Sequence, residues 1–256
     1  MKSVILCEGK DDLWFIGYYL HKTRKWEITT KPINWENYKV SPLNRKQEVN
    51  YLTNGEDSVA IWSVGGKDSF SHAVDILFEK FINAYPSDPI NSIVIMRDRD
   101  NESISTILQN VKEWFAEFVG EIDIENKSTS IWSNEIDGID VSVKITPLII
   151  PFSEEGAIET ILMNSISESS REGQVVVDEA KKYVNTLCDR EEVGTNYLTH
   201  ERLILKAKYS AVIAVTNPDH STGLFQDMVI SSPWENSEHV KEHFDVIVKA
   251  ISSNVE

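Results

Sequence analysis

The first half of the chain alternates short apolar runs with longer stretches of helical periodicity. Three runs, Ser3–Cys7, Val59–Val64 and Ser92–Met96, are mostly apolar and too short for helices, so each predicts a buried β-strand. Ser69–Ala84 and Ile104–Val119 instead space their apolar residues three and four apart, which predicts helices with one buried face. This alternation predicts an α/β fold with a mainly parallel sheet flanked by helices.

The segments around this pattern are less regular. A first helix is predicted directly after Ser3–Cys7 and Gly9, where Leu13, Phe15, Ile16, Tyr19 and Leu20 fall near helical spacing. Residues 22–57 are polar and rich in aromatic residues, and we interpret them as an irregular insertion between this helix and the second strand. Further on, Thr129–Trp132 and Ile139–Thr146 flank an Asp-Gly turn, which predicts a hairpin that continues into the strand Leu148–Phe152.

Beyond residue 152 the strand pattern stops. The predicted helices are Glu154–Asn164, Val175–Cys188, Thr199–Val215 and Ser237–Ser252. We therefore expect an α/β domain over residues 1–152, with the insertion at 22–57. A C-terminal helical extension over residues 153–256 is expected to pack on it.

Composition narrows the functional classes. The formal net charge is −16, which argues against a broad basic face for gripping duplex nucleic acid but leaves room for a local basic groove. The two cysteines form no metal-binding motif, so we expect buried thiols in a reducing compartment. The sequence has no leader-like N-terminus and no apolar run near 20 residues, so we expect a soluble, cytoplasmic protein with no membrane partner.

Candidate chemistry gathers where the predicted parallel strands end. Glu8 follows the first strand, Gly65 and Gly66 follow the second, and Asp98 and Asp100 follow the third. Ligands of open α/β sheets collect at the carboxyl ends of the strands, so three carboxylates are expected to converge there. Crowded carboxylates need a cation, and hard oxygen ligands favour Mg²⁺ or Mn²⁺ over zinc.

This order of motifs resembles the Toprim domain shared by topoisomerases, bacterial primases and nucleases of the overcoming-lysogenization-defect type. The resemblance covers roughly residues 1–152. It is carried by Val4-Ile-Leu-Cys-Glu-Gly-Lys-Asp-Asp12, Ser63-Val-Gly-Gly66 and Ile93-Val-Ile-Met-Arg-Asp-Arg-Asp100. It implies that Glu8 acts as a general acid or base or binds metal, and that Asp98 and Asp100 hold Mg²⁺. Asp12 matches a frequent acidic position, and Glu102 matches the third acidic residue of the longer motif.

A second acidic pair follows the last predicted strand. Glu155 and Glu159 are spaced i,i+4, which puts them on one face of the helix predicted there, and Glu154 is an alternative to Glu155. The segment resembles the Glu-rich helix of nuclease-type and small stand-alone Toprim proteins, in which such glutamates complete a second metal site. Two metal ions can stabilise both the attacking and the leaving oxygen in phosphoryl transfer. A solvated helix face is the alternative reading.

Basic and glycine residues near the same strand ends are candidates for binding substrate. The predicted substrate-binding residues are Lys10, Asp12, Gly65, Gly66, Lys67, Arg97 and Arg99. The cations could neutralise a phosphate backbone or could pair with nearby carboxylates. Trp26, Trp35, Tyr38 and Tyr51 in the insertion could stack bases or belong to the core. His239 and His243 are spaced i,i+4, which we attribute to coincidence on a surface.

The first functional hypothesis is a Mg²⁺- or Mn²⁺-dependent nuclease acting on DNA or RNA, in phage defence or nucleic-acid processing. The alternative is a non-catalytic Toprim scaffold or regulatory module that binds a partner ATPase or nucleic acid. A phosphatase for a small phosphorylated molecule is a third reading. The chain has no GxxxxGK[ST] motif, so any ATPase would be a separate partner. Homodimerisation is compatible with all three readings.

Overall fold

Two compact units make up the part of the chain that the computed structural model describes, which is residues 1–30, 35–38, 40 and 45–252. Unit 1 contains Met1–Arg97, Ser103–Ile149 and the residues from Phe244 on. Unit 2 contains Asp98–Glu102 and Ile150–His243. The chain passes from one unit to the other several times, so neither unit is one continuous segment of the sequence.

The sheet has a parallel centre. Within the described residues it has seven strands in the order β2-β3-β4-β1-β5-β7-β6. The strands are β1 (Lys2–Cys7), β2 (Glu27–Thr29), β3 (Glu48–Asn54), β4 (Asp57–Ser63), β5 (Ser92–Asp98), β6 (Ser130–Ile136) and β7 (Ile139–Ile150). β1 pairs in parallel with β4 and β5, whereas β2-β3-β4 and β6-β7 are antiparallel. The expected α/β fold is confirmed, and its parallel character is concentrated in the centre.

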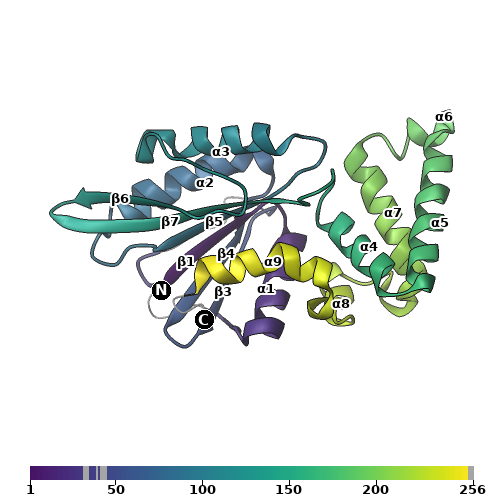
Figure 1. The fold of residues 1–256 in the computed structure, drawn as a ribbon, viewed down its shortest axis with the longest axis horizontal. Helices are drawn as coiled ribbons and strands as arrows, with labels where there is room; N and C mark the ends of the chain where they lie inside the picture. The colour runs from purple at the N-terminus through teal and green to yellow at the C-terminus, as the bar shows by residue number, and fades with distance from the viewer. Residues whose placement is uncertain (31–34, 39, 41–44, 253–256) are drawn as a thin grey trace. The chain divides into compact units, whose positions relative to one another are not determined.

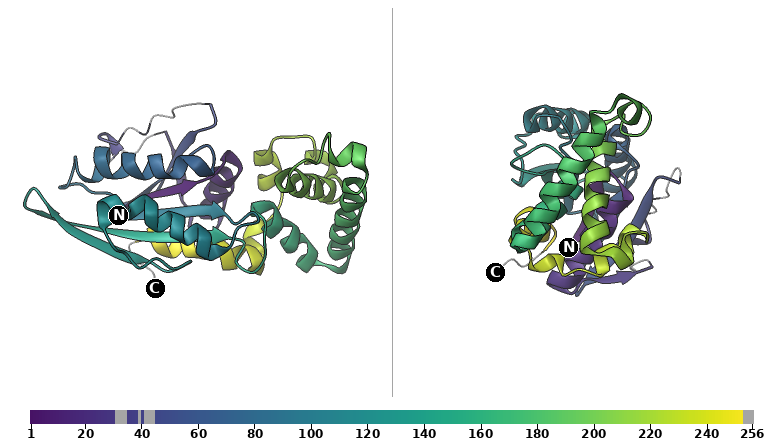
Figure 2. Two further views of the ribbon diagram at one scale, coloured as in Figure 1. Left: turned by 90° about the horizontal axis from the view of Figure 1, so that it is seen from above. Right: turned by 90° about the vertical axis from the view of Figure 1, so that its right-hand side faces the viewer.

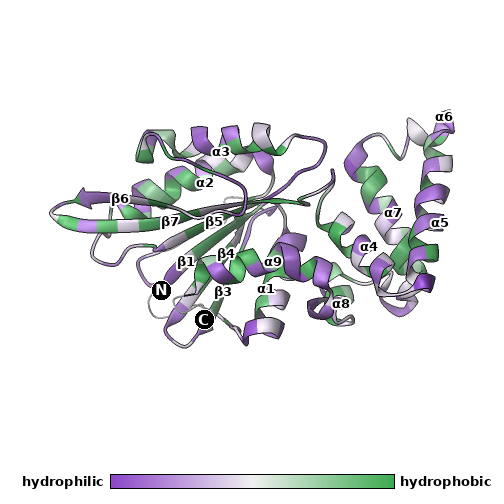
Figure 3. Cartoon of the chain, in the orientation of Figure 1, coloured by the Kyte–Doolittle hydropathy of each residue, from purple (hydrophilic) through white to green (hydrophobic). Residues whose placement is uncertain are grey.

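The central strands are apolar because both of their faces are covered. All six residues of β1 are buried, and the central strands are coloured mostly as hydrophobic in Figure 3. On one face lie α2 (Phe70–Ile76), the π-helical turn Leu77–Ile82 and α3 (Ile104–Val119), as Figures 1 and 2 show. Phe70 of α2 stacks on Trp114 of α3 at 5.3 Å between ring centroids, which fixes the two helices side by side.

The opposite face is covered by the first and last helices of the chain. α1 (Lys10–Arg24) packs against the end of α9 (Glu238–Ile251), where the rings of Phe15 and Phe244 lie 4.9 Å apart. The Tyr19 hydroxyl donates to Asp245 at 2.7 Å, and Ser92 of β5 donates to the carbonyl of Ala250 at 2.9 Å. The C-terminal residues of α9 are therefore part of unit 1.

The interpretation of residues 22–57 as irregular is wrong in part. This segment contains β2 and β3, which extend the sheet beyond β4. Trp26, Trp35 and Tyr38 are at most 1% exposed, so their rings fill the core and do not present faces for bases. Residues 31–34, 39 and 41–44 of the insertion lie outside the described residues.

Unit 2 is mainly helical, which agrees with the expected C-terminal helical extension. Its helices are α4 (Ile158–Ser169), α5 (Arg171–Cys188), α6 (Glu191–Gly194), α7 (Glu201–Thr216), α8 (Phe225–Ile230) and the start of α9. Among the described residues, no helix combines the length and apolar character that crossing a membrane requires.

Candidate metal centre

The end of β1 is enclosed by the two glycines that follow β4. The carbonyl oxygen of Glu8 accepts hydrogen bonds from the amides of Gly65 at 3.1 Å and Gly66 at 3.0 Å. Both glycines have positive φ, +87° and +127°, which residues with a side chain rarely adopt. The predicted Gly-Gly turn therefore binds the backbone of Glu8. Glu8 is buried, with 8% of its surface exposed.

The start of α1 organises two other predicted residues. The Gly9 amide donates to the carboxylate of Asp12 at 2.8 Å, so this buried side chain caps the helix. Lys10 forms an ion pair with Glu48 at 3.2 Å, while Lys67 is exposed after the Gly-Gly turn. Both lysines are therefore exposed to solvent.

Strand register relates Glu8 to the acidic motif of β5. Leu6 of β1 is paired with Ile95 of β5 in a parallel ladder, and Glu8 and Arg97 each lie two residues beyond this pair. Arg97 is only 3% exposed, and Asp98 follows it by one peptide bond as the last residue of β5. The strand order predicted for these motifs is therefore present in the fold.

In unit 2, the segment after β5 is bound by its backbone to the segment after β7. The Arg99 amide donates to the carbonyl of Ile150 at 2.6 Å. Asp100 and Gly156 exchange two backbone hydrogen bonds, both of 2.7 Å, which make an antiparallel bridge. Asp100 has φ +49°, a conformation that aspartate tolerates better than most residues. The Asp-x-Asp motif and the Glu154-Glu155 segment are therefore adjacent.

The expectation that Glu155 and Glu159 share a helical face is wrong. α4 begins at Ile158, and Gly156 (φ +135°) with the extended Ala157 keeps the preceding residues out of the helix. Glu155 is exposed in the turn next to the bridge. Glu159 is 6% exposed and pairs with Lys206 of α7 (Glu201–Thr216) at 3.1 Å.

Glu154 and Glu155, which sequence could not distinguish, have different surroundings. The carboxylate of Glu154 accepts a hydrogen bond from the side-chain amide of Asn164 on α4. Arg99 donates through Nε to the carbonyl of Glu102 at 3.2 Å, within the same loop as Asp100. The donors that Asp98, Asp100 and Glu155 offer are all carboxylate oxygens, which fit Mg²⁺ or Mn²⁺ better than a thiophilic metal.

A second group of side chains whose ligand atoms lie close enough to hold a metal ion was not predicted from the sequence. His239, Glu242 and His243 lie on one face of α9, and His243 is 1% exposed, so the attribution of the histidine pair to a surface is wrong. The signal in the sequence was the spacing of a histidine, a glutamate three residues later and a second histidine next to it.

Comparison with known proteins identifies a family for this chain, but the family's description names no activity. The family described as "Protein of unknown function (DUF3226)" matches residues 2–249. No curated protein matches the chain. A solved structure of hypothetical protein PH0156 from Pyrococcus horikoshii OT3 is similar over 96% of this chain and 99% of that one, with 14% sequence identity and a TM-score of 0.45.

Proposed function

We propose a function from the site itself, since the chain belongs to the DUF3226 family, whose description names no activity. The proposed function is Mg²⁺- or Mn²⁺-dependent cleavage of phosphodiester bonds in nucleic acid by a Toprim-like domain. Asp98, Asp100 and Glu155 are the proposed metal ligands, with Glu8 as a further ligand or as the general acid or base.

The observation that carries this proposal is the backbone bridge between Asp100 and Gly156. It joins two acidic segments that are more than fifty residues apart in the sequence. Because backbone groups make the bridge, the carboxylates of Asp100 and Glu155 are not consumed in holding the two segments together. Glu8 is added from the order of the sequence motifs, since it follows β1, which pairs in parallel with β5.

The residues have separate tasks in this proposal. A bound Mg²⁺ would neutralise charge that builds on a phosphate during displacement. Asp98 and Asp100 would orient the cation, and Glu8 at the end of β1 would hold or move a proton of the attacking water. We assign Glu155 rather than Glu154 to the cation because Glu154 accepts from Asn164. Glu159 has a structural task, because it pairs with Lys206.

Positive charge for the substrate backbone is limited. Lys67 is exposed beside the Gly-Gly turn, and Arg99 lies between the two aspartates of the motif. Arg97 is buried and is not the first choice for a phosphate contact, and Lys10 would have to leave its pair with Glu48 to make one. With a net charge of −16, we expect weak, salt-sensitive binding of nucleic acid rather than tight non-specific binding.

The test is cleavage of labelled single-stranded DNA, duplex DNA and RNA by the full chain in Mg²⁺, Mn²⁺ or EDTA. We expect cleavage by the wild-type protein only when metal is present. The double variant Asp98→Asn with Asp100→Asn should lose at least about 10³-fold in rate, the order typical of removing electrostatic stabilisation of a transition state.

The matched control is Asp137→Asn with Asp140→Asn, which changes charge equally at the exposed end of the β6–β7 hairpin, Asp137 in the turn and Asp140 near the start of β7. This control should cleave like wild type, and both double variants should keep the wild-type circular dichroism spectrum. Cleavage by the folded Asp98/Asp100 variant at the wild-type rate would show that the proposed assignment is wrong.

A second candidate function is binding of nucleic acid or of a partner ATPase without cleavage. The acidic net charge and the pairing of Lys10 favour it. In that case calorimetry would detect Mn²⁺ binding that depends on Asp98 and Asp100, while none of the three nucleic acids would be cut.

A further inference from the structure

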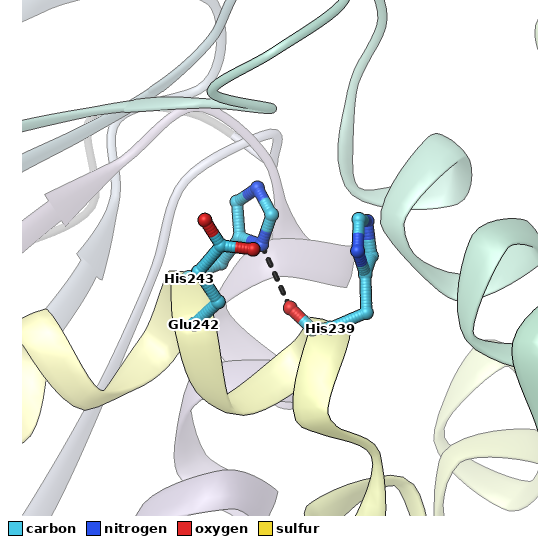
Figure 4. A group of neighbouring side chains, drawn as sticks. All are labelled: His239, Glu242 and His243. Atoms are coloured by element: carbon cyan, nitrogen blue, oxygen red, sulfur yellow. Dashed lines mark hydrogen bonds between the residues drawn. The ribbon is translucent and has the colours of Figure 1, made fainter.

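A histidine-containing group on α9 is distinct in chemistry from the carboxylates proposed above. His239, Glu242 and His243 belong to unit 2, and each offers one ligand atom within 4.8 Å of the other two. Figure 4 shows the three side chains leaving the same side of α9. The spacing i, i+3 and i+4 makes this inevitable on a regular helix.

The nitrogen atoms of His243 are unequal. Nδ1 lies 2.8 Å from the carbonyl oxygen of His239, so this nitrogen carries the proton and Nε2 keeps its lone pair. Nε2 accepts from the amide of Phe152 at 3.3 Å, which is long for such a bond. The ring is also stacked on Phe152 at 4.2 Å, which restricts its rotation.

His239 has a similar arrangement, although its Nδ1 lies beyond hydrogen-bond distance of its oxygen partner. Its Nδ1 faces the carboxylate of Glu168 on α4 at 3.6 Å, and its Nε2 lies 3.5 Å from the side-chain amide of Asn164. Each histidine thus directs Nδ1 to an oxygen and leaves Nε2 with a long contact to an amide nitrogen. Metal-bound histidines usually have this arrangement, with the second ring nitrogen held by a carbonyl or carboxylate.

We propose that His239, Glu242 and His243 bind a transition-metal cation such as Zn²⁺. Imidazole nitrogen favours Zn²⁺ over Mg²⁺, in contrast to the all-oxygen donors of Asp98 and Asp100. Ligands of a tetrahedral zinc ion stand about 3.4 Å apart, so the side chains would draw together by roughly 1 Å. Glu242 is exposed, which leaves a fourth position for water. Glu168 would act as a positioning residue that holds the ring of His239.

The experiment is a Zn²⁺ titration of the full, metal-free chain against a chromophoric chelator, in a Cys188→Ser background that removes the partly exposed thiol. Absorption of bound Co²⁺ gives the coordination geometry. We expect one equivalent of bound Zn²⁺ and a tetrahedral or five-coordinate Co²⁺ spectrum. His239→Ala should weaken Zn²⁺ binding at least about tenfold, and Glu168→Gln should weaken it by a smaller factor.

The control is His72→Ala, an exposed histidine on α2, which should bind Zn²⁺ like the parent. His239 is preferable to the buried His243 as the test position because its replacement is less harmful to folding. The Asp98→Asn/Asp100→Asn variant should keep the Zn²⁺ affinity, so failure of the proposed nuclease site does not decide this result. Unchanged Zn²⁺ affinity and Co²⁺ spectrum in folded His239→Ala would overturn the proposal.

Discussion

Glu155 in the turn before α4 and Glu159 in the first turn of α4 are used differently by the fold. In the turn, Asp100 and Gly156 are joined through backbone atoms, and Glu155 remains exposed beside them. In the helix, Glu159 is buried, and its charge is balanced by Lys206. A carboxylate that the backbone positions is available for a ligand, whereas one that is enclosed with a lysine is part of the packing.

The largest effect on stability is expected at Gly156, where the turn meets the helix. A Cβ added there would lie 2.0 Å from Oγ1 of Thr160, in a backbone with φ +135°. We expect Gly156→Ala to lower the free energy of unfolding by about 3 kcal/mol, since steric overlap and backbone strain each cost about 1–3 kcal/mol. Chemical denaturation monitored by circular dichroism measures this change.

Gly138→Ala is the matched control for that variant. Gly138 also has positive φ, +78°, but nothing lies within 4 Å of the position where its Cβ would be. Strain alone should therefore cost about 1 kcal/mol. Equal losses in the two variants would mean that contact with Thr160 does not define the turn, and the comparison with α4 would lose its structural basis.

The second-largest effect on stability is expected from the ion pair between Glu159 of α4 and Lys206 of α7. Lys206→Met leaves Glu159 buried without its cation, and we expect a loss of about 2 kcal/mol in the free energy of unfolding. This loss of free energy is smaller than for a fully buried ion pair because the Lys206 side chain is 40% exposed. Glu159→Gln should cost less, since the remaining lysine can reach water.

Lys182→Met tests whether burial is the cause. Lys182 pairs with Glu179 at 3.6 Å on α5, where both side chains are more than 60% exposed. Its replacement should change the free energy of unfolding by less than about 0.5 kcal/mol. If Lys206→Met is equally harmless, Glu159 is not held by the pair and returns to the set of candidate metal ligands.

The sequence predicted the centre of the sheet well because burial on both faces leaves a simple pattern. β1, β4 and β5 are apolar runs, and their ends carried the predicted motifs. β3 escaped prediction because most of its residues are only partly buried, so its polar and apolar residues do not alternate clearly. Its place depends on antiparallel pairing with β4, which a local pattern cannot reveal.

The residues of the candidate site could be predicted from the sequence, but their positions relative to one another could not. Glu155 and Glu159 have the spacing of one helical face, yet the φ of Gly156 and its bridge to Asp100 start the helix at Ile158. That bridge is a contact across more than fifty residues and has no local signature. The burial of His243 on α9 likewise has no local signature, because it involves contacts from outside the helix such as the stacking of Phe152.

The smallest effect on stability, and the sharpest test of the comparison, is expected at Glu155. Because the backbone holds the turn and this side chain is exposed, Glu155→Gln should change the free energy of unfolding by less than about 0.5 kcal/mol. The same variant should weaken Mn²⁺ binding, measured by calorimetry, because an amide oxygen carries no charge to attract the cation.

Glu154→Gln is the matched control. Glu154 is a neighbouring exposed glutamate, its replacement removes the same charge, and its carboxylate accepts a hydrogen bond from Asn164. If both variants weaken Mn²⁺ binding equally, the effect is general electrostatics and not coordination. If only Glu155→Gln weakens it, a carboxylate that contributes nothing to folding contributes directly to the ion, which is the distinction between the turn and the helix.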